Sequence, residues 1–141
     1  MKSKNHKLVS IVVPCFNSGK TLQRTIESIK NQTWPDKEII LINDGSNDKK
    51  TLEILKVYKN DSYINVVEQK NQGLASARNN GVIHSNGDYL FFLDSDDWID
   101  LNALEEFYNF LQNDKKVAYV FSDCLLEGSN KGVRRKVFNL F

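Results

Sequence analysis

Cysteine is scarce in this sequence, and long apolar runs are missing from it. The two cysteines, Cys15 and Cys124, are too few for a disulfide scaffold and lack the spacing of a zinc site. We therefore expect both to be reduced, as in a cytoplasmic protein. The longest apolar runs have the length of β-strands, which predicts no membrane span. Residues 1–7 are polar and the next apolar run ends at Pro14, so we expect no signal peptide.

Neither sign of charge dominates the composition. The chain has 19 lysines and arginines against 18 aspartates and glutamates, for a net charge of +1. This balance argues against binding to nucleic acid through a broad basic field. With 141 residues, 40% of them hydrophobic, the chain suits one domain of about 100–200 residues. It is long enough to bury one core, but not two.

Short apolar runs alternate with amphipathic stretches along the chain. The apolar runs predict strands at residues 8–13, 38–42, 63–68, 89–93 and 117–121. The stretches between them predict helices at residues 21–32, 48–59, 74–83 and 101–111. Alternating strands and helices favour a mainly parallel sheet covered on both faces. We therefore predict a doubly wound, Rossmann-like α/β fold.

Polar groups gather at the predicted carboxyl ends of the strands, where doubly wound folds bind ligands. The acidic cluster Asp94-Ser95-Asp96-Asp97 follows the fourth strand. Carboxylates so close together repel one another unless a cation neutralises them, and oxygen ligands suit Mg²⁺ or Mn²⁺. If the chain stays extended there, Asp94 and Asp96 face the same side. Asp97 or Asp100 can instead serve only as a cap for the next helix.

Two more strand ends carry candidate ligand-binding residues. Asp44 ends the second strand, where a carboxylate can accept a hydrogen bond from uracil N3–H. The alternative for Asp44 is an Asx-turn with Ser46 or Asn47. Gly73 precedes a helix and permits close approach of a ligand. Arg78, within that helix, can brace the acidic cluster or contact a phosphate.

Four blocks of this sequence resemble the signature blocks of the family 2 glycosyltransferases with the GT-A fold. They are VSIVVPCFN at residues 9–17, IILINDGSND at 39–48, NQGLASARNNG at 71–81 and YLFFLDSDDW at 89–98. They occur in the family's order, and the resemblance covers roughly residues 7–123. It implies inverting transfer of a sugar from a nucleoside diphosphate donor, commonly a UDP-sugar, with Mg²⁺ or Mn²⁺.

The resemblance also assigns roles to residues. It implies nucleotide binding by Pro14, Cys15, Phe16, Asn17, Asp44, Gly73, Arg78, Asp94 and Ser95. Asp96 would be the main metal ligand, with Asp94 in the metal shell. The family's general base lies in its C-terminal half, so we expect the base beyond Phe141 and assign no catalytic residue within this chain.

The resemblance divides the chain into a tail of residues 1–6, a nucleotide-sugar-binding domain of residues 7–124, and a connection of residues 125–141 toward an acceptor-binding half. The expected partners are a UDP-sugar donor and a glycan or lipid-linked acceptor, in glycan or cell-surface polysaccharide synthesis. We expect a cytoplasmic location, with the inner face of the membrane as one alternative. A homo-oligomer of this chain is left open as a further alternative. The alternative is a nucleotide-sugar-binding module without catalytic activity.

Overall fold

The computed structural model describes residues 6–113, 116–122, 124–126 and 132–134. The chain divides into two compact units, residues 1–104 and 105–141. No helix in the described part of the chain has the length and apolar character needed to cross a membrane.

The first unit alternates strands with helices, as the sequence predicts. In chain order its elements are β1 (Val9–Cys15), α1 (Leu22–Lys30), β2 (Lys37–Asp44), α2 (Lys49–Tyr58), β3 (Ile64–Gln69), α3 (Leu74–Ile83) and β4 (Tyr89–Phe92). Asp48 caps α2, because its carboxylate accepts a hydrogen bond from the Thr51 N–H at 2.9 Å.

The four strands form one parallel sheet in the order β3-β2-β1-β4. The chain steps from β1 outward to β3, and β4 then returns to the other side of β1. The crevice at the carboxyl ends of β1 and β4 is therefore a topological switch point, where folds of this kind bind ligands. The register places Cys15 beside Asn43 and Asp44 beside Gln69, so these residues reach the same edge of the sheet.

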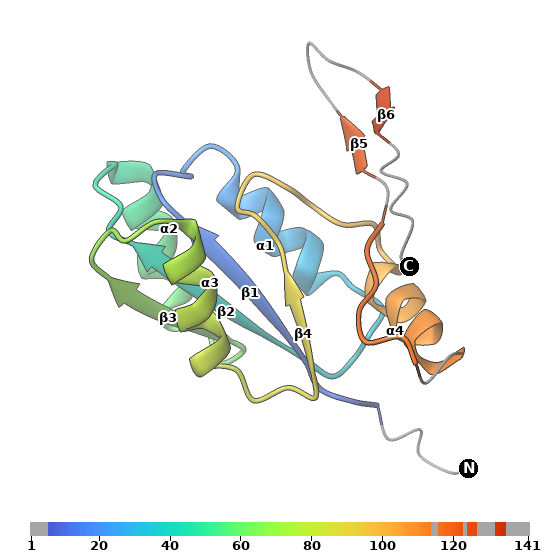
Figure 1. Cartoon of the computed structure of the whole chain (residues 1–141). Helices are drawn as coiled ribbons and strands as arrows, with labels where there is room; N and C mark the ends of the chain where they lie inside the picture. The colour runs from blue at the N-terminus through green and yellow to red at the C-terminus, as the bar shows by residue number, and fades with distance from the viewer. Residues whose placement is uncertain (1–5, 114–115, 123, 127–131, 135–141) are drawn as a thin grey trace. The chain divides into compact units, whose positions relative to one another are not determined.

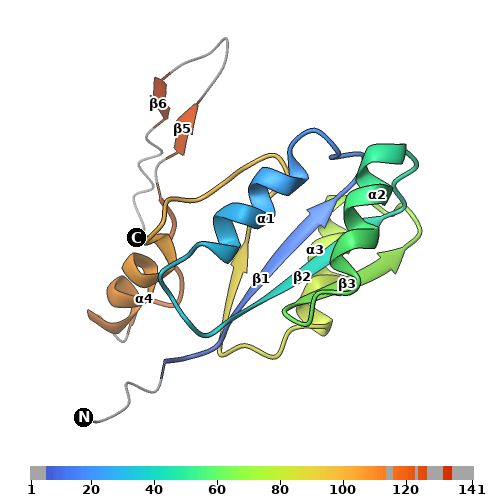
Figure 2. The same cartoon turned by 180° about the vertical axis from the view of Figure 1, so that it is seen from behind.

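Helices cover both faces of this sheet, with α3 on one face and α1 and α2 on the other (Figures 1 and 2). All seven residues of β1 are buried, as expected for a central strand covered on both faces. On the α3 face, Ala77 packs with Val12, Ile40 and Ile42. A Cβ atom at Gly81 would overlap the side chain of Val12, so α3 lies very close to the sheet.

The second unit agrees with the predicted helix at residues 101–111 and differs from the predicted strand at residues 117–121. Its elements are α4 (Ala103–Asn113), which begins at the end of the first unit, and an antiparallel pair, β5 (Cys124–Leu126) with β6 (Gly132–Arg134). The strand predicted at residues 117–121 is wrong, because the backbone there is irregular, with Tyr119 61% and Phe121 51% exposed. Strand propensity describes how well a side chain fits a pleated, half-buried surface, and an apolar run cannot by itself supply the partner strand.

Candidate functional site

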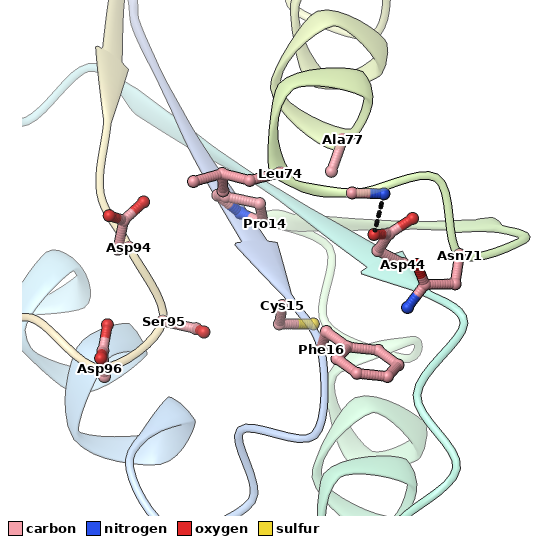
Figure 3. A pocket seen from close by; sticks show the side chains of 11 residues that line it. Pro14, Cys15, Phe16, Asp44, Asn71, Leu74, Ala77, Asp94, Ser95 and Asp96 are labelled. Carbon is pink, nitrogen blue, oxygen red and sulfur yellow. Dashed lines mark hydrogen bonds between the residues drawn. The ribbon is translucent and has the colours of Figure 1, made fainter.

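A cavity of about 490 Å³ opens at the carboxyl ends of the parallel strands, which is within the size range of small-molecule sites. Its lining consists of Pro14, Cys15, Phe16, Asp44, Asn71, Gly73, Leu74, Ala77, Asp94, Ser95 and Asp96. Figure 3 shows Asp94 and Asp96 on one side of the cavity and Asp44 with Asn71 on the other, with the end of β1 between them. The fold thus brings residues from four distant segments to one place.

The acidic side of the cavity is a turn, and the chain there is not extended. The Asp97 N–H donates to the Asp94 carbonyl at 3.0 Å, so the condition for a strand-like alternation of Asp94 and Asp96 is not met. Both side chains nevertheless line the cavity. The Arg78 guanidinium donates to the Asp94 carboxylate at 2.6 Å, which is the bracing role considered for this arginine. Arg78 lies outside the lining set and reaches the cavity through Asp94.

The acidic turn carries negative charge that Arg78 offsets only in part. Burial raises the pKa of Asp97, and the charges of Asp96 and Asp94 raise it further. Among the described residues, no three His, Cys, Asp or Glu side chains converge as a ready-made metal cluster. Two carboxylates at the edge of an open cavity suit a Mg²⁺-like cation, which uses one or two protein carboxylates and completes its shell with water and substrate phosphates. The donor set therefore fits a divalent cation that arrives with a phosphate ligand.

Asp44 is buried on the other side of the cavity and is 4% exposed. Its Oδ1 accepts hydrogen bonds from the Gln72 N–H at 2.8 Å and the Gln69 side-chain amide at 2.7 Å, and its Oδ2 accepts from the Gly73 N–H at 2.8 Å. Burial raises the pKa of Asp44, but these hydrogen bonds outweigh it and hold the pKa below its usual value. The Asx-turn considered for Asp44 is not formed, because the Ser46 N–H donates to Asn43 Oδ1 at 2.9 Å and the Asn47 N–H donates to Asn17 Oδ1 at 2.9 Å.

Asn17 joins two loops beside the cavity and lies outside the set of residues that line it. It adopts a left-handed backbone conformation, with φ of 52°, which asparagine tolerates better than most residues. Its side-chain oxygen accepts hydrogen bonds from the N–H groups of Asn47 at 2.9 Å and Asp48 at 3.1 Å. Asn17 therefore ties the loop after β1 to the loop after β2.

Comparison with known proteins supplies a family. The model of the family described as glycosyl transferase family 2 matches residues 10–139. The chain belongs to this family.

Among curated family 2 relatives, the chain is 40% identical over 136 residues to the poly(ribitol-phosphate) beta-N-acetylglucosaminyltransferase TarP of Staphylococcus aureus, covering 94% of this chain and 41% of that protein. It is 44% identical over 102 residues to the cholesterol galactosyltransferase of Borreliella burgdorferi, covering 72% of this chain and 28% of that protein. The chain thus spans less than half the length of these two relatives.

A solved structure resembles the fold as well. The crystal structure of S. aureus TarS 1-349 in complex with UDP-GlcNAc matches with a TM-score of 0.67 and 30% identity, covering 76% of this chain and 31% of that one. The predicted α/β fold of the GT-A type is thereby confirmed, with its parallel sheet and its helices on both faces.

Three residues of this family 2 cavity, Asn71, Leu74 and Ala77, were not singled out as site residues from the sequence. All three line the cavity and lie within the block at residues 71–81. Helical spacing could have found Leu74 and Ala77, because positions 74 and 77 are three apart and face the same side of α3. The small or apolar character of these two residues indicates packing at least as well as binding, and Asn71 precedes the helix, so helical spacing does not indicate it.

Cys15 is expected to resist alkylation in the folded protein. It is 2% exposed, and burial, with the charges of Glu68, Asp44 and Asp48, raises the pKa of its thiol to about 12. Because the thiolate is the reactive form, iodoacetamide at pH 8 should modify Cys15 at least about a hundredfold more slowly than in denaturant. Mass spectrometry of the Cys15 peptide over time measures this rate. Equal rates in the folded and denatured chain would contradict the buried, neutral thiol.

Proposed function

We propose that this chain binds the nucleoside diphosphate of a UDP-sugar together with Mg²⁺ or Mn²⁺, for inverting transfer of the sugar to an acceptor hydroxyl in glycan synthesis. The supporting observation is the polarity of the cavity, with Asp44 on one side and Asp94 and Asp96 on the other. The Asp44 side offers a hydrogen-bond acceptor for the nucleobase of the donor. The side with Asp94 and Asp96 offers oxygen ligands for a cation that is bound to the donor's phosphates.

The base side is suited to uracil. A carboxylate offers about four lone-pair positions, and Asp44 uses three of them for Gln69, Gln72 and Gly73. The remaining position on Oδ2 can accept the uracil N3–H. Cytosine carries no hydrogen on N3, so an acceptor here discriminates between the two pyrimidines. Phe16 and Leu74 line the cavity and are 48% and 49% exposed, which offers apolar surface to a flat ring.

The phosphate side is suited to a leaving group. Breaking the bond between the sugar and the diphosphate builds negative charge on the diphosphate oxygens. A divalent cation on those oxygens stabilises that charge. We propose that Asp96, with Asp94, holds the cation, and that Arg78 keeps the Asp94 carboxylate in place through its hydrogen bond at 2.6 Å. Deprotonation of the acceptor hydroxyl requires a further base, and we assign no residue of this cavity to that step.

Donor binding is tested by calorimetry of the 141-residue chain with UDP, CDP and GDP, each with and without Mn²⁺. We expect UDP to bind more tightly than CDP or GDP, and Mn²⁺ to tighten UDP binding by at least about tenfold, which is about 1.4 kcal/mol. Absence of UDP binding in the presence of Mn²⁺ would contradict the proposal. Transfer of sugar from a UDP-sugar by the same chain would distinguish an enzyme from a module that binds the donor without turnover.

A further inference from the structure

Helix α1 carries a row of polar side chains beside its buried apolar ones. Thr25, Ser28 and Gln32 are three and four positions apart, so they lie on one side of the helix and its end. Thr25 is 1% exposed and Gln32 5% exposed. Because buried polar groups are almost always hydrogen-bonded, their partners indicate what this row does.

Two of their hydrogen bonds stay within α1 and its end, from the Ser28 hydroxyl to the Thr25 carbonyl at 2.8 Å and from the Gln32 side-chain amide to the Ser28 carbonyl at 3.0 Å. The other partners lie in the segment that follows β4, residues 95–104, which begins in the acidic turn. The Thr25 hydroxyl lies 3.0 Å from the Ser95 carbonyl and 2.7 Å from the Asp97 carbonyl. The Ser28 hydroxyl accepts from the Ile99 N–H at 3.3 Å. Gln32 donates to the Asp100 carbonyl at 2.6 Å and accepts from the Leu104 N–H at 3.2 Å. One side of α1 thus holds the whole segment by its backbone.

Thr25 acts on the backbone on either side of Asp96. The Ser95 carbonyl belongs to the peptide unit before Asp96, and the Asp97 carbonyl belongs to the second unit after it. Between them, the Asp97 N–H is held by the Asp94 carbonyl at 3.0 Å. A hydroxyl has a single hydrogen, so the two carbonyls share it. Three successive peptide units around Asp96 are therefore fixed, while its exposed side chain lines the cavity.

We propose that Thr25 is a positioning residue that aims the Asp96 carboxylate into the cavity. The proposal rests on the proposed function, in which Asp96 holds the divalent cation. Holding the carboxylate in place before the cation arrives lowers the ordering cost of binding. Thr25 itself touches neither the nucleotide nor the cation in this account, and acts only through the backbone of the acidic turn.

Two further contacts support the same turn from α1 and the loop before it. The hydroxyls of Ser18 and Ser95 are 2.6 Å apart. The guanidinium of Arg24 lies 3.2 Å from the centre of the Trp98 ring. Neither of these two contacts engages the backbone on both sides of Asp96. Loss of the Thr25 hydroxyl should therefore alter the cation site more selectively than loss of either of them.

Thr25→Val removes the hydroxyl and keeps the branched shape of the side chain. The quantity to measure is the factor by which Mn²⁺ tightens UDP binding, obtained by calorimetry of the 141-residue chain with and without the metal. We expect Thr25→Val to lower this coupling factor at least about fivefold while metal-free UDP affinity changes less than about threefold. Thr25→Ser, which restores the hydroxyl, should return the factor to its value in the unchanged chain.

Thr51→Val is the matched control. Thr51 is 0% exposed and lies in α2, where its N–H is held by Asp48, so the same chemical change is made at an equally buried threonine away from the acidic turn. We expect this variant to keep the full Mn²⁺ factor. A general loosening of the fold in Thr25→Val would lower metal-free and metal-dependent binding together.

The outcomes separate this inference from the proposed function. If the unchanged chain binds UDP without any effect of Mn²⁺, the proposed metal site fails and Thr25 has nothing to position. If the unchanged chain shows the effect and a folded Thr25→Val chain shows it equally, only the positioning role is overturned. Circular dichroism reports folding, and Thr25→Ala is a second variant without the hydroxyl. If neither variant folds, the hydroxyl serves the fold and the positioning role is likewise rejected.

Discussion

Replacing Asp44 with asparagine is expected to weaken UDP binding and lower the melting temperature together. The Asp44 carboxylate accepts three hydrogen bonds, two of them from the backbone N–H groups of Gln72 and Gly73. An amide of the same size places its own N–H₂ group against at least one of these donors. Leaving a buried donor without an acceptor costs about 1–3 kcal/mol, and the loop of residues 71–73 should move away from the cavity.

Binding of UDP to Asp44→Asn should fall by at least about tenfold, or about 1.4 kcal/mol, in calorimetry without metal. Because an amide can donate to cytosine N3, the preference for UDP over CDP should fall as well. Asp48→Asn is the matched control, since Asp48 caps α2 and asparagine caps helices about as well as aspartate. Unchanged UDP affinity and unchanged selectivity in Asp44→Asn would contradict the role of this carboxylate in reading the base.

The lowered pKa of Asp44 gives its contribution to stability a definite dependence on pH. Burial raises this pKa, and the hydrogen bonds from Gln72, Gln69 and Gly73 lower it by more. A group whose folded pKa lies below its unfolded value stabilises the fold above the unfolded pKa of about 3.9. This contribution to stability decreases once the pH falls below about 4, and it is lost when the pH has fallen through the pKa of Asp44 in the folded chain. Thermal denaturation between pH 3 and pH 7 should show a smaller dependence on pH in Asp44→Asn than in the unchanged chain.

The sheet and its binding edge could be predicted from the sequence because each depends on local signals. Apolar runs set β1, β2 and β4, and the polar residues that follow them must meet at one edge of a parallel sheet. The run at residues 117–121 carried the same local signal and forms no strand in the described residues, since a strand also needs a partner that local sequence does not reveal. Pattern therefore predicts where a strand can form, and tertiary contacts decide whether it does.

The individual roles of polar residues were harder to predict, because they depend on distances between segments. Asn43 and Asp44 are adjacent and similar in shape, yet Asn43 accepts from the Ser46 N–H and Asp44 holds the loop before α3. The sequence predicts no role for Thr25. Its partners are about 70 residues away, at Ser95 and Asp97, and no spacing within α1 indicates them.

Replacing Asp96 with alanine is expected to abolish the effect of Mn²⁺ on UDP binding while leaving metal-free binding nearly intact. Asp96 lines the cavity with an exposed carboxylate, whereas the Asp94 carboxylate is already engaged by Arg78 at 2.6 Å. The loss of Asp96 therefore removes the carboxylate of this side of the cavity that is not paired with Arg78. A coupling of at least about tenfold in the unchanged chain should fall below about twofold in Asp96→Ala.

Asp100→Ala removes an equal charge from the same loop at a position outside the cavity lining, and it should keep the full Mn²⁺ effect. The comparison separates a specific ligand from general attraction between a cation and an acidic surface, because exposed charges act over about 8–10 Å at ordinary ionic strength. Repeating the titration in added salt sharpens the test, since salt weakens general attraction more than direct coordination. Equal loss of the Mn²⁺ effect in Asp96→Ala and Asp100→Ala would show that the acidic turn attracts cations only as a charged surface.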